Sequence, residues 1–298
     1  MTEIVLLDGS IGQEIVRRAG DRPTPLWATR AMLDHPGLLK QVHADYFRAG
    51  ATIATTNTYA IHRDRFVETG LEGDFERLIA QALAEATAAR DGFGGGRIAG
   101  SIGPLGASYR ADVVPVPEIA APLIAEVAGL LAPQVDLLIC ETVCSLNQAE
   151  GALRGVVETG LPVWLAVTVS DSDGSRLRSG EAVADLGDIV ARYQPAAVLA
   201  NCSVPEAMAA ALGPIGDFGL PFGAYANGFR AITSAFLQDR PTVDALEARS
   251  DLGPEDYADF AQSWVEMGAS IVGGCCETGP VHIAAVKNRL ERAGHVIV

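Results

Sequence analysis

Three of the five cysteines stand where they could act together. Cys275 and Cys276 are adjacent in the segment GGCCETGP, and Cys202 follows the apolar run Ala197–Ala200. Thiolates are soft ligands, and three of them leave a tetrahedral Zn²⁺ one open position, as in catalytic zinc sites. A lone cysteine is more often a small buried apolar residue. Two adjacent cysteines with a third at another strand end favour the zinc interpretation.

The remaining cysteines and histidines form no comparable pattern. Cys140 lies within an apolar run, and Cys144 follows it after three residues, a spacing that does not single out zinc. We therefore expect both to be structural. The five histidines show no metal-ligand spacing either, and they stand at positions 35, 43, 62, 282 and 295.

Several polar residues follow apolar runs and are candidates for binding a substrate. Glu141 comes directly after the run Val135–Cys140, where a carboxylate needs a partner or loses hydration energy. Asp8 belongs to an Asp-Gly pair, which a simple turn would also explain. Asn57 and Asn201 follow two further runs, where they could support loops or contact a substrate.

The elements that must position these residues alternate along the chain. Short runs rich in Val, Ile and Leu are followed by stretches rich in Ala, Leu, Glu and Arg, which predicts alternating strands and helices. We expect strands at Ile4–Leu7, Ala51–Thr55, Arg97–Ser101, Val135–Cys140, Val163–Val169, Ala197–Ala200, Phe222–Tyr225 and Ser270–Val272. We expect helices near Pro36–Ala49, Asp74–Ala89, Pro117–Leu131, Leu146–Glu158, Ala182–Tyr193, Pro205–Leu212, Pro254–Met267 and Val281–Ala293.

Eight such units fit one (β/α)8 barrel, so we expect residues 1–298 to form a single α/β domain of the TIM-barrel class. An open doubly wound sheet is the alternative, but its six or so strands would leave two units over. Catalytic residues of a barrel collect at the carboxyl ends of its strands. Because strands six and eight are near neighbours, Cys202 would meet Cys275 and Cys276 on one rim.

Composition excludes several kinds of partner. The 298 residues include 22 basic and 37 acidic side chains, a net charge of −15, which argues against nucleic acid and anionic membrane surfaces. The longest stretch free of charged residues covers 14 positions, 49–62, whereas a membrane helix needs about 20. The first residues do not resemble a signal peptide, and an odd number of cysteines favours reduced thiols. We therefore expect a cytoplasmic protein.

The chain resembles the homocysteine S-methyltransferase family over nearly its whole length. That family includes betaine-dependent and S-methylmethionine-dependent enzymes and the homocysteine module of methionine synthase. The segment DGSIGQEI, Asp8–Ile15, is similar to the family's D-G-x-x-G-T-E-L, with Gln13 in place of Thr. The segment TNTY, Thr56–Tyr59, and the pair Glu141-Thr142 resemble two further family motifs.

The cysteine segments carry the more specific part of the resemblance. Asn201-Cys202 matches the end of the family's Gly-x-Asn-Cys, although Leu199 replaces the glycine. GGCCETGP is similar to G-G-C-C-G-T-T-P, from which Glu277 and Gly279 depart. These departures leave the expected metal ligands intact, but Glu277 places a negative charge beside the zinc, on the donor side.

The resemblance implies a zinc bound by Cys202, Cys275 and Cys276 and a methyl transfer to homocysteine that yields methionine. It implies that Asp8 and Glu141 contact the substrate ammonium. Backbone N–H groups near Gly9 and Ser10 would hold its carboxylate, with Asn57 and Asn201 as further substrate-binding candidates.

The chemistry of such a centre indicates the kind of methyl donor. The pKa of a free thiol is about 8.5, and coordination to zinc deprotonates the thiol. An anionic centre would attract a small cationic donor, S-methylmethionine or a similar onium compound, and such cations bind well over aromatic faces. The candidate aromatic residues are Trp27, Tyr59 and Tyr225. Two alternatives are a zinc hydrolase and a non-catalytic zinc or thiol redox-sensing protein.

Overall fold

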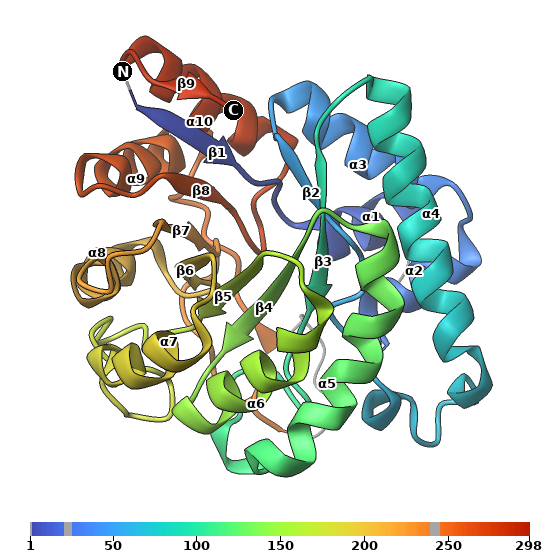
Figure 1. Cartoon of the computed structure of the whole chain (residues 1–298). Coiled ribbons are helices and arrows are strands. Elements are labelled where there is room, and N and C mark those ends of the chain that lie inside the picture. The colour runs from blue at the N-terminus through green and yellow to red at the C-terminus, as the bar shows by residue number, and fades with distance from the viewer. Residues whose placement is uncertain (1, 21–25, 239–244) are drawn as a thin grey trace.

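The computed structural model describes residues 2–20, 26–238 and 245–298, and they form a (β/α)8 barrel (Figure 1). The eight barrel strands are β1 (Glu3–Leu6), β2 (Ile53–Thr55), β3 (Arg97–Ile102), β4 (Leu137–Val143), β5 (Val163–Val167), β6 (Ala197–Asn201), β7 (Phe222–Ala226) and β8 (Ile271–Gly274). Neighbouring strands from β2 to β8 and on to β1 are parallel. A parallel bridge between Leu7 and Ile53 closes the ring. The predicted barrel is confirmed.

Helices surround the ring of strands. They are α1 (Ile11–Ala19), α2 (Trp27–Asp34), α3 (Leu38–Ala49), α4 (Phe75–Phe93), α5 (Pro117–Leu131), α6 (Leu146–Val156), α7 (Gly187–Tyr193), α8 (Pro205–Gly216), α9 (Pro254–Glu266) and α10 (Pro280–Arg292). Proline opens four of them, α5, α8, α9 and α10, where its missing N–H breaks no hydrogen bond. The sequence predicted neither α1 nor α2, which lie between β1 and α3.

The alternation of side chains along the strands gives the barrel two apolar layers. Leu137 and Ile139 of β4 belong to the cluster inside the ring, whereas Leu138 and Cys140 pack in the larger cluster between strands and helices. Side chains two residues apart on a strand share a face. Continuing the inner row of β4 therefore brings Glu141 to the inside of the barrel at its carboxyl end.

A ninth strand, β9 (Val296–Ile297), was not predicted because its two residues are too short for any periodic signal. It is parallel to β1, with Glu3 opposite Val296 and Ile4 opposite Ile297. β9 therefore covers the amino-terminal half of β1, on the side where only Leu7 reaches β2. The two ends of the chain lie side by side at this point (Figure 1).

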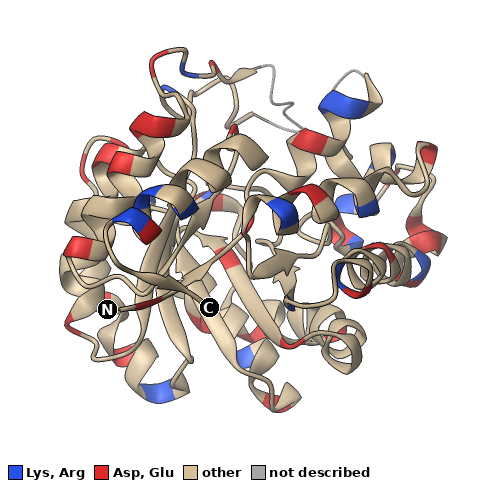
Figure 2. Cartoon of the chain, turned by 90° about the horizontal axis from the view of Figure 1, so that it is seen from above, with Lys and Arg blue, Asp and Glu red and all other residues tan. Residues whose placement is uncertain are grey.

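Charged residues lie mainly on the helices and loops that surround the strands (Figure 2). Many of them form exposed ion pairs, such as Arg63 with Glu126 and Arg192 with Glu150. Within the described residues, each helix is too short or too polar to cross a membrane.

Candidate active site

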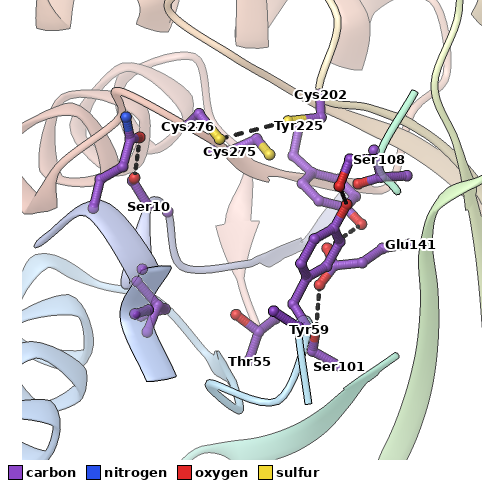
Figure 3. A pocket seen from close by; sticks show the side chains of 18 of the residues that line it. Ser10, Thr55, Tyr59, Ser101, Ser108, Glu141, Cys202, Tyr225, Cys275 and Cys276 are labelled. Carbon is purple, nitrogen blue, oxygen red and sulfur yellow. Dashed lines mark hydrogen bonds between the residues drawn. The ribbon is translucent and has the colours of Figure 1, made fainter. Parts of the chain in front are cut away.

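A pocket opens at the carboxyl ends of the barrel strands (Figure 3). The empty space in the pocket and its open mouth together is about 970 Å³. Thiols from the ends of β6 and β8 lie on one side, and carboxylates from the ends of β1 and β4 lie on the other. These side chains therefore lie at the rim where the sequence predicted them, and their roles stay predictions.

The three predicted metal-ligand cysteines converge. The sulfurs of Cys202, Cys275 and Cys276 all lie within 4.8 Å of one another, and Cys202 Sγ is 3.8 Å from Cys276 Sγ. Sulfurs at about 2.3 Å from a tetrahedral Zn²⁺ would be about 3.8 Å apart. The three residues thus fit a zinc ion by ligand type and by spacing. Cys140 and Cys144 are fully buried and do not line the pocket.

Two glycines allow the double-cysteine segment to turn into the pocket. A Cβ atom at Gly274 would lie 2.0 Å from Thr278 Oγ1, and one at Gly273 would lie 2.5 Å from the Cβ of Leu7. No side chain fits at such distances, so both positions require glycine. The turn is then fixed because Thr278 Oγ1 donates to the carbonyl of Cys275 at 2.6 Å.

The three thiols differ in acidity because they share hydrogen bonds. Burial opposes ionisation of Cys202, but hydrogen bonds from Cys275, Cys276 and Tyr109 outweigh it and lower the pKa of the Cys202 thiol. The same bonds to Cys202 raise the pKa values of the Cys275 and Cys276 thiols. The cluster therefore favours one thiolate stabilised by its neighbours.

The opposite wall carries two carboxylates with hydrogen-bond donors already in place. Asp8 accepts from the Thr55 amide at 2.7 Å and from the Thr55 hydroxyl at 2.8 Å. Glu141 accepts from Ser101 Oγ and, at 3.0 Å, from Tyr225 Oη. Burial raises the pKa of Asp8, and burial raises the pKa of Glu141 to about 7. Both side chains line the pocket and would gain from a cationic partner.

Of the other predicted substrate residues, some line the pocket and one does not. Gly9, Ser10 and Asn57 line the pocket. The amide of Ser10 already donates to the Thr278 carbonyl at 2.9 Å, and its hydroxyl donates to Gln13 Oε1 at 2.7 Å. The Ser10 amide is therefore not available to a substrate carboxylate in this structure.

Asn201 lies behind the pocket wall. Its side chain accepts from the amide of Thr142 and donates to Thr142 Oγ1, both at 3.0 Å. Asn201 is fully buried and does not line the pocket. This arrangement supports the irregular end of β4, where Thr142 follows Glu141.

Several residues at the site were not predicted. Thr55 is the last residue of β2, and Ser101 is the last but one of β3. Strand alternation places both on the inner face with Glu141. Tyr109 and Phe236 come from loops, and their rings pack edge to face with centroids 5.9 Å apart. Alternation could have identified the first two, whereas no local pattern identifies the loop residues.

Backbone strain is concentrated at this end of the barrel. Six non-glycine residues in the described part of the chain have a positive φ, and three of them, Tyr109, Thr142 and Cys202, line the pocket. A fourth, Glu277 with φ of 65°, directly follows Cys276. Such conformations persist where surrounding contacts fix them, and they cluster at functional sites.

Two departures from the family pattern contact each other. Gln13 Nε2 donates to Glu277 Oε1 at 2.5 Å, and Gln13 Oε1 accepts from the Glu277 amide at 2.6 Å. Gln13 lines the pocket from α1, and Glu277 belongs to the double-cysteine loop. The pair therefore links the two sides of the site. Burial raises the pKa of Glu277, and the hydrogen bond from Gln13 opposes this shift. Glu277 does not line the pocket, and its effect on the donor stays a prediction.

Aromatic side chains enclose the space next to the thiols. Tyr59, Tyr109, Tyr225, Phe229 and Phe236 all line the pocket. Tyr59 Oη is fixed by a 2.7 Å hydrogen bond with Ser108 Oγ (Figure 3). The predicted contributions of Tyr59 and Tyr225 to this wall are thus in place, whereas the side chain of Trp27 lies outside the described part of the structure.

Comparisons with known proteins agree with this geometry. Residues 5–290 match the family described as Homocysteine S-methyltransferase. The homocysteine S-methyltransferase of Escherichia coli is 32% identical, with 96% of this chain and 95% of the relative covered. Homocysteine S-methyltransferase YbgG of Bacillus subtilis is 29% identical, with coverages of 95% and 93%. The crystal structure of the metallated homocysteine methyltransferase MmuM from Escherichia coli superposes with a TM-score of 0.80 at 28% identity and 96% coverage of both chains.

Proposed function

The chain belongs to the homocysteine S-methyltransferase family, and from that premise we propose that it moves a methyl group from a small onium donor to the thiol of homocysteine, giving methionine. The observation that carries the proposal is one pocket with three sulfurs at zinc-ligand spacing on one side and two buried carboxylates on the other. The first suits a thiol, and the second suits an ammonium group.

Cys202, Cys275 and Cys276 are the residues that would hold Zn²⁺. When bound, the ion would lower the pKa of a coordinated substrate thiol from its usual value near 8.5. Three thiolates supply enough negative charge to keep the substrate sulfur electron-rich. The same three ligands disfavour a zinc hydrolase, whose bound water is usually made acidic by histidine-rich ligand sets.

Glu141 and Asp8 would bind the homocysteine ammonium. Ser101 and Tyr225 hold the Glu141 carboxylate in place, and Thr55 holds Asp8, so both acceptors are oriented before substrate arrives. The substrate carboxylate would lie near Gly9 and the first turn of α1, where helix N–H groups and the helix dipole favour an anion. Asn57 borders this end of the pocket, and Asn201 would act through Thr142, which follows Glu141 in β4.

The aromatic side chains beside the thiols would bind the donor cation. S-methylmethionine or a similar onium compound would place its methyl carbon against the substrate sulfur, in line with the bond that breaks, at about 3–3.5 Å. The new bond joins that methyl to the homocysteine sulfur, and the electron pair of the broken bond returns to the donor. The thiol proton leaves to solvent.

We further propose that the whole chain acts as a single domain in the cytoplasm. The eight barrel strands form one ring, and the residues assigned to the site lie at or just beyond the carboxyl ends of these strands. A reducing compartment would keep Cys202, Cys275 and Cys276 as free thiols, as a metal site requires.

The test offers the zinc-loaded protein homocysteine together with one donor at a time. The donors are S-methylmethionine, S-adenosylmethionine, betaine, dimethylsulfoniopropionate and methylfolate. We expect methionine to form fastest with a small sulfonium donor. Absence of methionine with every donor, from protein that holds one zinc per chain, would contradict the proposal. Hydrolysis of esters or amides without a methyl donor would favour the hydrolase alternative instead.

A further inference from the structure

We propose that Tyr109 is a positioning residue that fixes the Cys202 sulfur and draws negative charge from it. This inference rests on the proposed function, because it concerns the same metal ligands. Tyr109 Oη donates a hydrogen bond to Cys202 Sγ at 3.1 Å. The two residues are 93 positions apart in the sequence, and they meet in the loops that follow β3 and β6.

The phenol is held from several sides. Tyr109 has a left-handed backbone, with φ of 63°, and its side chain is buried. Its ring packs edge to face against Phe236. The guanidinium carbon of Arg178 lies 4.9 Å from the centre of the same ring. A tyrosine in a strained conformation with this many contacts has little freedom to move its hydroxyl away from Cys202.

Arg178 is itself fixed by a partly buried ion pair. Its guanidinium donates to both carboxylate oxygens of Asp171 at 2.8 and 3.2 Å, and its Nε donates to Thr168 Oγ1 at 3.0 Å. Asp171 also accepts from the amides of Val204 and Ile232, in the loops that follow β6 and β7. Asp171, Arg178 and Tyr109 therefore form a rigid support behind the Cys202 sulfur.

The support has an electronic effect as well as a geometric one. A cation over the face of a phenol ring withdraws electron density, so Arg178 makes the Tyr109 hydroxyl a stronger donor. A thiolate that accepts a hydrogen bond donates less charge to a metal. Tyr109 would thereby leave the centre more able to attract the thiolate of homocysteine.

The test replaces Tyr109 with phenylalanine, which removes one oxygen and keeps the ring. In the Co²⁺-loaded protein, we expect Tyr109→Phe to move the sulfur-to-cobalt charge-transfer band to longer wavelength. Removal of a partner in the outer shell of a metal site typically costs about 10- to 100-fold in affinity or activity. We expect about tenfold weaker Co²⁺ binding in chelator competition and a higher KM for homocysteine, with kcat changed by less than about threefold.

Two further variants keep the result interpretable. Tyr193→Phe makes the same change on the outside of the barrel, where Tyr193 Oη contacts Glu150 at 3.4 Å, and it should leave band, affinity and KM unchanged. Arg178→Lys keeps the positive charge but loses the planar contact with the Tyr109 ring. The charge-transfer band of this variant should therefore also move to longer wavelength, by less than in Tyr109→Phe. Should Tyr109→Phe fail to fold, Arg178→Lys carries the test.

An unmoved band and an unchanged KM in the variant that carries the test would overturn the role of Tyr109. Failure of the proposed function would give a different result. If only the methyltransferase function is wrong, the wild-type protein would bind Co²⁺ and the band would still move in Tyr109→Phe, but no methionine would form.

Discussion

On the carboxylate side of the pocket, Asp8 and Glu141 each accept two hydrogen bonds from residues of other barrel strands. On the thiol side, within the described residues, Tyr109 is the one side chain other than the cysteines that donates to a sulfur of the cluster. The carboxylates extend from strand ends or directly follow them. Cys275 and Cys276 lie in a loop that depends on two glycines.

The difference shows which half of the site the protein completes by itself. The hydrogen bonds to Asp8 and Glu141 hold both carboxylates in place without a ligand, so we expect this side to be oriented for an ammonium before substrate binds. The three clustered thiols have zinc-ligand spacing, so we expect the other side to be stabilised most by a metal. Specificity for the acceptor and reactivity of its sulfur are therefore assigned to separate structural elements, and variants should separate them.

The largest effects should come from the thiol side. Cys202→Ser, Cys275→Ser and Cys276→Ser should each lose most of the bound zinc and at least about 100-fold of activity, because a hydroxyl is a poor soft-metal ligand. Cys140→Ser and Cys144→Ser should keep the metal, since both thiols are buried away from the pocket. Elemental analysis of the five variants measures this. Full zinc retention by Cys202→Ser would remove that residue from the ligand set.

The next largest effect should come from the carboxylate side and leave the metal in place. Glu141→Gln keeps the shape of the side chain and removes its charge. Loss of one partner in such an ion pair typically costs about 2–5 kcal/mol of binding. Homocysteine should bind more weakly, while zinc content stays unchanged.

The matched control for Glu141→Gln is an acceptor without the amino group. The ratio of kcat/KM for homocysteine to that for 4-mercaptobutyrate, measured at saturating donor, should fall in the variant. An unaltered ratio would mean that Glu141 serves the structure of the rim and not the substrate.

The carboxylate side should also make binding depend on pH. The pKa of Glu141 in the free protein is about 7, and an ammonium binds its ionised form. Between pH 8 and pH 6 the ionised fraction falls from about nine tenths to about one tenth, so binding should weaken about tenfold. Methionine is the useful probe, because it has the ammonium and carboxylate of the acceptor and no thiol proton.

Calorimetric titration with methionine at several pH values measures this dependence. Glu141→Gln should bind weakly and show little change across the same range. A wild-type affinity that is flat from pH 6 to pH 8 would place the ammonium on another group.

The smallest effect should come from the contact that joins the two sides. Gln13→Thr removes both hydrogen bonds of the pair, whereas Glu277→Gly removes only the bond to the carboxylate and also relieves a left-handed backbone at φ of 65°. In urea unfolding, Gln13→Thr should destabilise the protein by about 1 kcal/mol when Glu277 is present and by less alongside Glu277→Gly, where only the bond from the backbone N–H is left to lose. Additive effects of the two substitutions would show that the contact does not couple the two sides.

The sequence predicted the barrel because each strand is a compact apolar run. All eight expected strands are present with bounds within three residues. Helices α1 and α2 were missed since they are 9 and 8 residues long and follow one another within the first connection. β9 is defined by its pairing with β1 and not by its own composition.

At the site, the sequence predicted residues that are close to a strand end and chemically distinctive. Cys202, Cys275, Cys276, Asp8 and Glu141 reach the pocket as expected, although their roles in binding remain predictions. The sequence did not predict residues whose contacts are with positions far away in the chain. Tyr109 meets Cys202 across 93 positions, and Asn201 faces Thr142 across 59, so neither contact has a local signal.

The ribosome synthesises β1 before the other strands and β9 after them. These two strands nevertheless pair, with Glu3 opposite Val296 and Ile4 opposite Ile297. On its other side, β1 pairs with β8, which is also made late. At about 5–20 residues per second, synthesis of the chain takes about 15–60 s. During most of that time the first strand has main-chain partners only at β2, and contacts this distant in sequence form slowly. Until β8 and β9 have been made, the nascent chain thus carries β1 without its two main partners, and we expect the chain to be most prone to aggregation in this interval.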